Sequence, residues 1–90
     1  MRIISQNGMN DYPYEQCMIF VNYKERTKLC ISMCGDGADS EFPLGTYDSE
    51  EDALYVMECI RYNKKKGYDY FHMPSADDVS TWRQNKGGEL

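Results

Sequence analysis

Four cysteines and one histidine are the residues of this 90-residue chain whose types could bind a metal ion or act as nucleophiles. Cys30 and Cys34 fall in one predicted strand, where about 3.3 Å of rise per residue sets their Cα atoms roughly 13 Å apart, too far for a disulfide or one shared metal ion. Cys17 belongs to another predicted strand and Cys59 to a predicted helix, so a site with His72 would require separate elements to converge. We therefore expect structural thiols, no metal, no cofactor and no catalytic residue; a metal or redox site and a Cys–His pair are the alternatives.

A run of acidic residues is the second feature with chemical meaning. The segment 36–52 holds seven acids and no Lys or Arg, namely Asp36, Asp39, Glu41, Asp48, Glu50, Glu51 and Asp52. Such a segment could dock on a basic surface, for instance by imitating a nucleic-acid backbone on a nuclease or a DNA-binding protein. The alternative is a solvated loop followed by acids that favour a helix N-terminus. The order of the acids does not match a calcium loop, because the D-x-D-x-D-G pattern and a distant bidentate Glu are missing.

The chain also contains eight tyrosines, and four of them flank predicted strands: Tyr12, Tyr14, Tyr68 and Tyr70. Tyrosine offers a large contact area with few rotatable bonds, which suits interfaces, although a small core also uses it as a filler. Both roles remain open here. The residues that we expect to contact a protein partner with a basic surface are Asp36, Asp39, Glu41, Glu50, Glu51, Tyr68 and Tyr70.

One predicted helix within the segment 46–68 organises these candidates. Its start is marked by Asp48 or Ser49 as N-cap, and its end by Gly67. Acids in its first turn and lysines in its last turn suit the helix dipole, which explains the basic end without a phosphate ligand. Its apolar face follows the i, i+3, i+4, i+7 spacing through Ala53, Val56, Met57 and Ile60, with Leu54 and Cys59 widening that stripe.

Short strands are predicted on both sides of the helix, over residues 2–5, 16–23, 29–34, 42–47 and 68–73. The turn signal Gln6-Asn7-Gly8 favours an early hairpin. Strand 16–23 is apolar on both faces and is therefore expected at the centre of a sheet, whereas Pro43 places strand 42–47 at an edge. We expect an α+β fold, with an antiparallel sheet of four or five strands and one long helix packed on one face.

Length and charge limit the class of protein. Ninety residues make one domain, expected over residues 1–79 and followed by a polar, partly flexible tail over residues 80–90. A small core leaves few side chains for a deep pocket, which argues against an enzyme. The net charge of -5 disfavours direct nucleic-acid binding. The start MRIISQNG lacks the apolar run of a signal peptide, and no segment reaches the roughly 18 apolar residues of a membrane span, so we expect a cytoplasmic protein.

Self-association is a further expectation. With one helix on one face of the sheet, the opposite face would expose Met18 and Phe20, and small domains often cover such a face by symmetric pairing. We therefore expect a homodimer.

Four segments, MRIISQNG, DYPYEQC, YDSEEDALYVMECI and FHMPSADDV, resemble a family of small, uncharacterised proteins found in Gram-positive phages, prophages and conjugative elements. The resemblance extends to about Val79 and brings no catalytic residue. It implies cargo of a mobile element in a bacterial host. The expected function is a non-enzymatic interaction protein, an anti-defence factor that blocks a host defence or regulatory protein. The alternative is a small-ligand binding or sponge protein that holds a nucleotide-like molecule in an aromatic groove.

Overall fold

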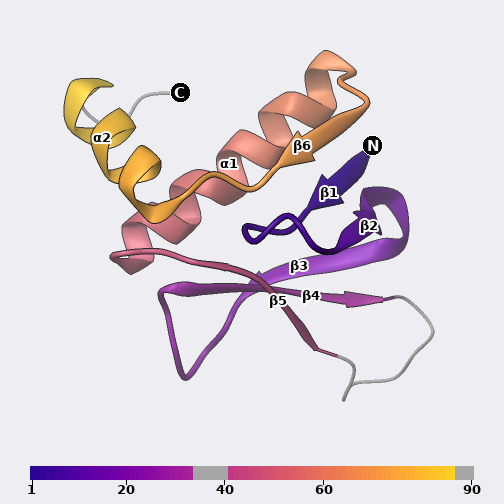
Figure 1. Cartoon of the computed structure of the whole chain (residues 1–90), viewed down its shortest axis with the longest axis horizontal. Coiled ribbons are helices and arrows are strands. Elements are labelled where there is room, and N and C mark those ends of the chain that lie inside the picture. Colours follow the sequence, from indigo (N-terminus) through magenta and orange to yellow (C-terminus); the bar gives the residue numbers. More distant parts are fainter. Residues whose placement is uncertain (34–40, 87–90) are drawn as a thin grey trace.

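Two three-stranded sheets and two helices make up the part of the chain that the structure, a computed structural model, describes: residues 1–33 and 41–86 (Figure 1). The elements follow in the order β1 (Arg2–Ile4), β2 (Asp11–Pro13), the single 3-10 turn η1 (Tyr14–Gln16), β3 (Cys17–Val21), β4 (Lys28–Met33), β5 (Phe42–Thr46), α1 (Glu50–Lys66), β6 (Tyr70–His72) and α2 (Ala76–Lys86).

The strands form two separate sheets, one in the order β2-β1-β6 and one in the order β3-β4-β5. The predicted hairpin is confirmed, since β1 and β2 pair antiparallel, but β6 joins β1 in parallel, with Ile3 opposite Phe71. The α+β class is therefore confirmed, and the single antiparallel sheet with one long helix is wrong. The division has a local cause, because the 3-10 turn η1 follows β2 directly and turns the chain before β3 begins.

The helix α1 has the ends that its sequence predicts. Ser49 is the N-cap, whose hydroxyl accepts a hydrogen bond from the backbone N–H of Asp52 at 3.1 Å. Gly67 ends the helix at a φ of 84°, in the left-handed region that favours glycine. Leu54, expected to widen the apolar stripe, is instead 46% exposed, and Tyr55 is buried.

The second helix, α2, explains this difference. Ser75 caps it as predicted, through a 3.1 Å bond from the N–H of Asp78, but the helix then continues to Lys86, past the expected domain end at Val79. α2 lies beside the first half of α1 (Figure 1), on the flank that carries Asp52 and, one turn later, Tyr55. The sequence of α2 has little amphipathic character, so no periodic pattern of apolar residues indicated how far the helix extends.

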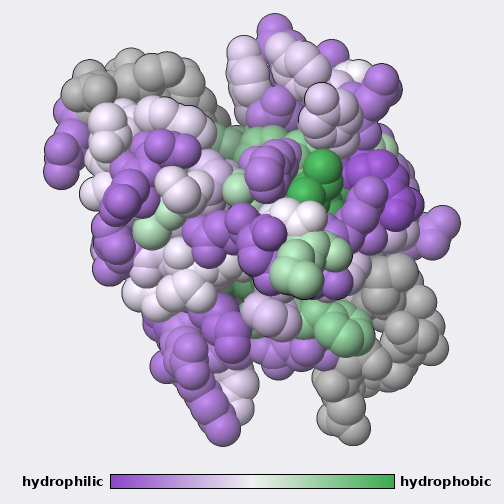
Figure 2. All heavy atoms as spheres, viewed as in Figure 1, coloured by the Kyte–Doolittle hydropathy of each residue, from purple (hydrophilic) through white to green (hydrophobic). Residues whose placement is uncertain are grey.

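The core lies between the sheets and the helices. On the face drawn in Figure 2, hydrophobic residues gather in the middle, between α1 and the strands below it, and hydrophilic residues surround them. The buried cluster includes Ile3, Leu29, Ile31, Leu44, Ala53, Val56, Ile60, Met73 and Val79. Among the described residues no helix has both the length and the apolar character needed to cross a bilayer.

β3 is an edge strand, and the prediction that it lies at the centre of its sheet is wrong. β4 occupies the centre, with β3 on one side and β5 on the other. The strand is apolar on both faces for another reason: Ile19 points towards α1, and Met18 and Phe20 point to the outer face of the sheet. That outer face leaves Met18 62% exposed.

Candidate functional site

The residues expected to contact a partner lie in different parts of the structure. Asp36 and Asp39 fall outside the described residues. Glu41 precedes β5, and Glu50 and Glu51 open α1, so the length of β5 separates them. The acidic residues are adjacent in sequence, but the described ones do not form a single surface.

Several of these acids have polar or basic partners. Glu50 Oε2 lies 3.1 Å from Nη1 of Arg26. The side chain of Asp52 is almost wholly buried and lies 2.6 Å from Nη1 of Arg83. The Glu41 carboxylate accepts a 2.6 Å hydrogen bond from the amide of Asn22. The two arginines offset part of the negative charge of the segment.

The described cysteines are Cys17, Cys30 and Cys59, and Cys34 lies outside the described residues. Burial raises the pKa of the Cys30 thiol to about 11, and the hydrogen bond to the Glu41 carboxylate is the next cause. The same hydrogen bond lowers the pKa of Glu41. Cys30 is therefore a neutral thiol at pH 7 rather than a nucleophile. Within residues 1–33 and 41–86, no three His, Cys, Asp or Glu side chains are grouped to hold a metal ion, and His72 is exposed on β6.

Three exposed tyrosines, Tyr62, Tyr68 and Tyr70, lie between the last part of α1 and the start of β6, and we call this region the tyrosine end. Their side chains are 49%, 58% and 65% exposed, respectively. Lys66 places its ammonium 5.5 Å from the ring centre of Tyr62. At 1.5 Å per residue along the helix axis, Tyr62 lies about 18 Å and the end of α1 about 24 Å from Glu50. Glu50 and Glu51 therefore lie at one end of α1, and the tyrosines lie near or beyond the other.

The backbone of the tyrosine end is fixed by the helix cap. Gly67 N–H donates to the carbonyl of Lys64 at 3.1 Å, and Tyr68 N–H donates to the carbonyl of Asn63 at 3.2 Å, the two bonds of a Schellman motif. Arg2 N–H then donates to the carbonyl of Asp69 at 2.9 Å, which holds the start of β6 against β1. The three rings are exposed, but the chain that carries two of them is ordered by these bonds.

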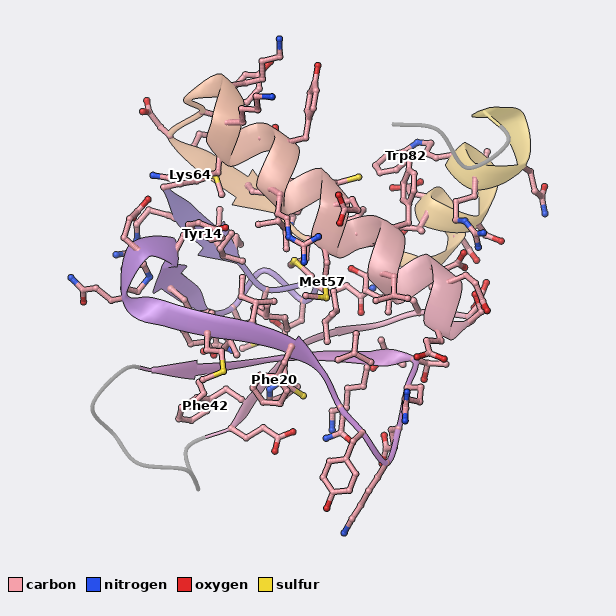
Figure 3. All side chains as sticks on the ribbon, turned by 180° about the vertical axis from the view of Figure 1, so that it is seen from behind. Tyr14, Phe20, Phe42, Met57, Lys64 and Trp82 are labelled. Atoms are coloured by element: carbon pink, nitrogen blue, oxygen red, sulfur yellow. The ribbon has the colours of Figure 1, made fainter. Side chains whose placement is uncertain are left out.

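A groove lies between α1 and β3, and we call it the α1–β3 groove. Its volume is about 280 Å³, and its lining residues are Tyr14, Glu15, Cys17, Ile19, Met57, Ile60 and Arg61. Figure 3 shows Met57 pointing from α1 towards β3, and Tyr14 and Lys64 together at one end. The lining combines apolar side chains, among them Met57 and Ile60, with the charged groups of Glu15 and Arg61. This groove was not predicted, because nothing in the sequence shows that η1 turns Tyr14 and Glu15 towards α1.

Glu15 connects three segments at the rim of that groove. Its carboxylate accepts hydrogen bonds from the Met1 ammonium at 2.8 and 2.9 Å and from the ammonium of Lys64, which also lies 5.9 Å from the ring centre of Tyr14. These bonds, that of Lys64 first and that of Met1 second, lower the pKa of Glu15 to about 2. Glu15 therefore stays ionised in acid well below its ordinary pKa.

The depressed pKa predicts how stability depends on pH. The unfolded chain holds Glu15 near its ordinary pKa of 4.5, so the stabilisation is complete above that value and is lost as the pH falls towards about 2. In Glu15→Gln this contribution is missing. We expect the melting temperature of the variant to lie below that of the wild type at pH 7 and the two to converge near pH 2. A temperature difference that stays constant from pH 7 to pH 2 would contradict the assignment.

Comparison with protein-family models, with curated proteins and with solved structures found no match to this chain.

Proposed function

We propose that this chain is a non-enzymatic protein-interaction module that acts through its tyrosine end. Its partner would be a host defence or regulatory protein in a bacterial cytoplasm, the setting implied by the resemblance to proteins of mobile elements. The single observation that supports this proposal is the exposure of Tyr62, Tyr68 and Tyr70, which are 49%, 58% and 65% exposed on a backbone held by a helix cap.

Pre-ordering is what makes such a surface effective. Binding costs free energy for every side chain and loop that it immobilises, so a surface with a fixed backbone loses less on association. Tyrosine rings add a large contact area and a hydroxyl that can hydrogen-bond at the rim. Two exposed lysines near the rings, Lys65 and Lys66, would meet acidic or polar groups of the partner.

A partner with a basic surface, as expected from the acidic segment, would have to contact the opposite end of α1. There Asp48 and Glu51 are exposed and Glu50 is partly neutralised by Arg26. The salt dependence of binding would identify such a contact, because screening reduces the association rate of a charge-steered complex.

The test is capture of a partner from the lysate of a bacterial host, followed by mass spectrometry and an affinity measurement with the purified partner. We expect Tyr68→Ala combined with Tyr70→Ala to weaken binding by at least tenfold. Tyr23→Ala is the matched control, because Tyr23 is 75% exposed in the connection between β3 and β4, away from the tyrosine end. Equal affinity of the double variant and the wild type would refute the tyrosine end as the binding surface. A loss that appears only on neutralising Glu50 and Glu51 would instead assign binding to the acidic end.

The α1–β3 groove supports a second candidate function, binding of a small ligand. Its volume of about 280 Å³ is close to the lower end of the range of about 300–1,000 Å³ for ligand pockets. A flat ligand could stack on Tyr14, and Arg61 could meet an anionic group at the rim. A thermal-shift screen with nucleotides separates the two functions, because a ligand at about 100 times its dissociation constant adds about 2.7 kcal/mol to the free energy of unfolding. A module that binds only protein would show no shift with any of them.

A further inference from the structure

The edges of the two sheets differ in how well they are protected from pairing with another strand. β2 and β6 have three residues each, and β2 contains Pro13. β5 contains Pro43 and a register shift against β4, and the N–H of Gln6 bonds to its Leu44 carbonyl at 2.7 Å. Short strands, prolines, bulges and covering segments are the features by which natural sheets block edge pairing. β3 has none of these features: its five residues, Cys-Met-Ile-Phe-Val, contain no proline and no charge.

The hydrogen-bond pattern shows which groups of β3 face that edge. Asn22 N–H donates to the carbonyl of Lys28 at 2.9 Å, which makes these two residues a hydrogen-bonded pair. Such pairs alternate along an antiparallel ladder, so Phe20 and Met18 also bond to β4. The N–H and C=O groups of Ile19 and Val21 therefore point away from β4. In Figure 3, β3 lies in front of β4, and no described strand pairs with its outer edge.

We infer that the outer edge of β3 is an interface for a second copy of this chain, which pairs there antiparallel through its own β3. The register that uses the outward groups is centred on Ile19, so that Ile19 pairs with Ile19 of the second copy. The N–H of Val21 then donates to the carbonyl of Cys17 of the second copy. The N–H of Cys17 already donates to the carbonyl of Tyr14 and is not needed. The β3-β4-β5 sheets of the two copies would join into one continuous sheet. The outer edge of β3 would then be covered in both copies.

The side chains fit the same two-fold arrangement. On the outer face, Met18 of one copy would lie opposite Phe20 of the other, which would cover a side chain that is 62% exposed in the single chain. On the inner face, Ile19 and Val21 of the second copy would close the open side of the α1–β3 groove beside Met57.

From the sequence, we expected a dimer that packs through the outer face of the sheet. In the arrangement inferred from the structure, the two copies pair through the edge of β3 instead. This inference does not depend on the proposed host partner.

Light scattering of the full chain and amide hydrogen exchange test the inference together. We expect the mass to approach twice the 10.5 kDa of one chain at high micromolar concentration. In the dimer the amides of Ile19 and Val21 should exchange at least tenfold more slowly than after dilution to the monomer. Val21→Pro removes an N–H that bonds to nothing in β4, and this variant should be monomeric with an unchanged circular dichroism spectrum. Leu54→Ser, on the exposed side of α1, is the matched control and should dimerise like the wild type.

A chain that stays monomeric at every concentration would overturn the inference and leave the β3 edge to a strand from a different protein. A dimer in which the amides of Ile19 and Val21 exchange as fast as in the monomer would also overturn it, in favour of packing through the outer face. The exchange measurement needs no variant, so the test stands even if Val21→Pro fails to fold.

Discussion

Replacing Ile60 by alanine is expected to lower the free energy of unfolding by about 2–5 kcal/mol, the range for large-to-small substitutions in a packed core. Ile60 is 1% exposed and joins the buried cluster from the middle of α1. Its side chain also lines the α1–β3 groove, so the cavity left by the truncation can open towards solvent. The loss should therefore lie in the lower half of that range. Urea denaturation of the purified variant measures it directly.

Leu54→Ala is the matched control for Ile60→Ala, because it also truncates an aliphatic residue on α1 to alanine. Leu54 is 46% exposed, and substitutions at such surface positions usually change stability by less than about 0.5 kcal/mol. Similar losses in the two variants would contradict the orientation of α1, because Leu54 would then be buried together with Ile60.

The second large effect is expected on replacing Arg83 by methionine. Asp52 keeps 5% of its side chain exposed, and its carboxylate is bound by Arg83, which is one-third exposed. Removing one partner of a buried ion pair costs about 3–5 kcal/mol, because the other charge stays buried without compensation. Solvent at Arg83 screens the pair in part, so we expect about 2–4 kcal/mol. Chemical denaturation gives the value, and loss of helix signal would report release of α2.

A double variant and an exposed pair provide the controls for Arg83→Met. Adding Asp52→Asn removes the buried charge, so the double variant should lose less than the sum of the two single losses. Arg26→Met breaks the Arg26–Glu50 pair, whose side chains are 61% and 40% exposed, and should cost less than about 1 kcal/mol. Equal losses for Arg83→Met and Arg26→Met would show that the Asp52–Arg83 pair is not buried in solution.

The parts of the fold that the sequence predicts are those that local chemistry determines. Ser49 and Gly67 bound α1 because a capping hydroxyl and a residue with positive φ are needed at these positions. The β3–β4 hairpin and the edge position of β5 follow from alternation and from Pro43 in the same way. Each of these features depends on residues within a few positions of one another.

The parts that could not be predicted depend on contacts between distant segments. An apolar strand sequence fits both the centre and the edge of a sheet. β3 lies at an edge because η1 turns the chain away from β2 before β3 begins. α2 is ordered by its contact with α1, including the pair between Asp52 and Arg83, and not by its own periodicity. Tyr55 is buried for the same reason.

The features of the candidate site also differ in whether local sequence could predict them. Tyr68 and Tyr70 could be named from the sequence because they follow a well-marked helix end, and both are exposed in the structure. Their distance from Glu50 could be foreseen only from the length of α1. The groove beside Met57 and the open edge of β3 could not be foreseen. Both depend on β3 being the outermost strand of its sheet and lying next to α1.

The parallel pairing of β1 with β6 has a consequence for how the chain reaches this structure. Ile3 and Phe71 are partners, so β1 acquires its last neighbour only after α1 has been made. Contacts of such long sequence separation slow folding, because the loop between them must close before they stabilise anything. The hairpin of β3 and β4 needs only the short connection 22–27 and can form early. We expect the closure of β6 on β1 to be the rate-limiting event, after the β3–β4 hairpin has formed.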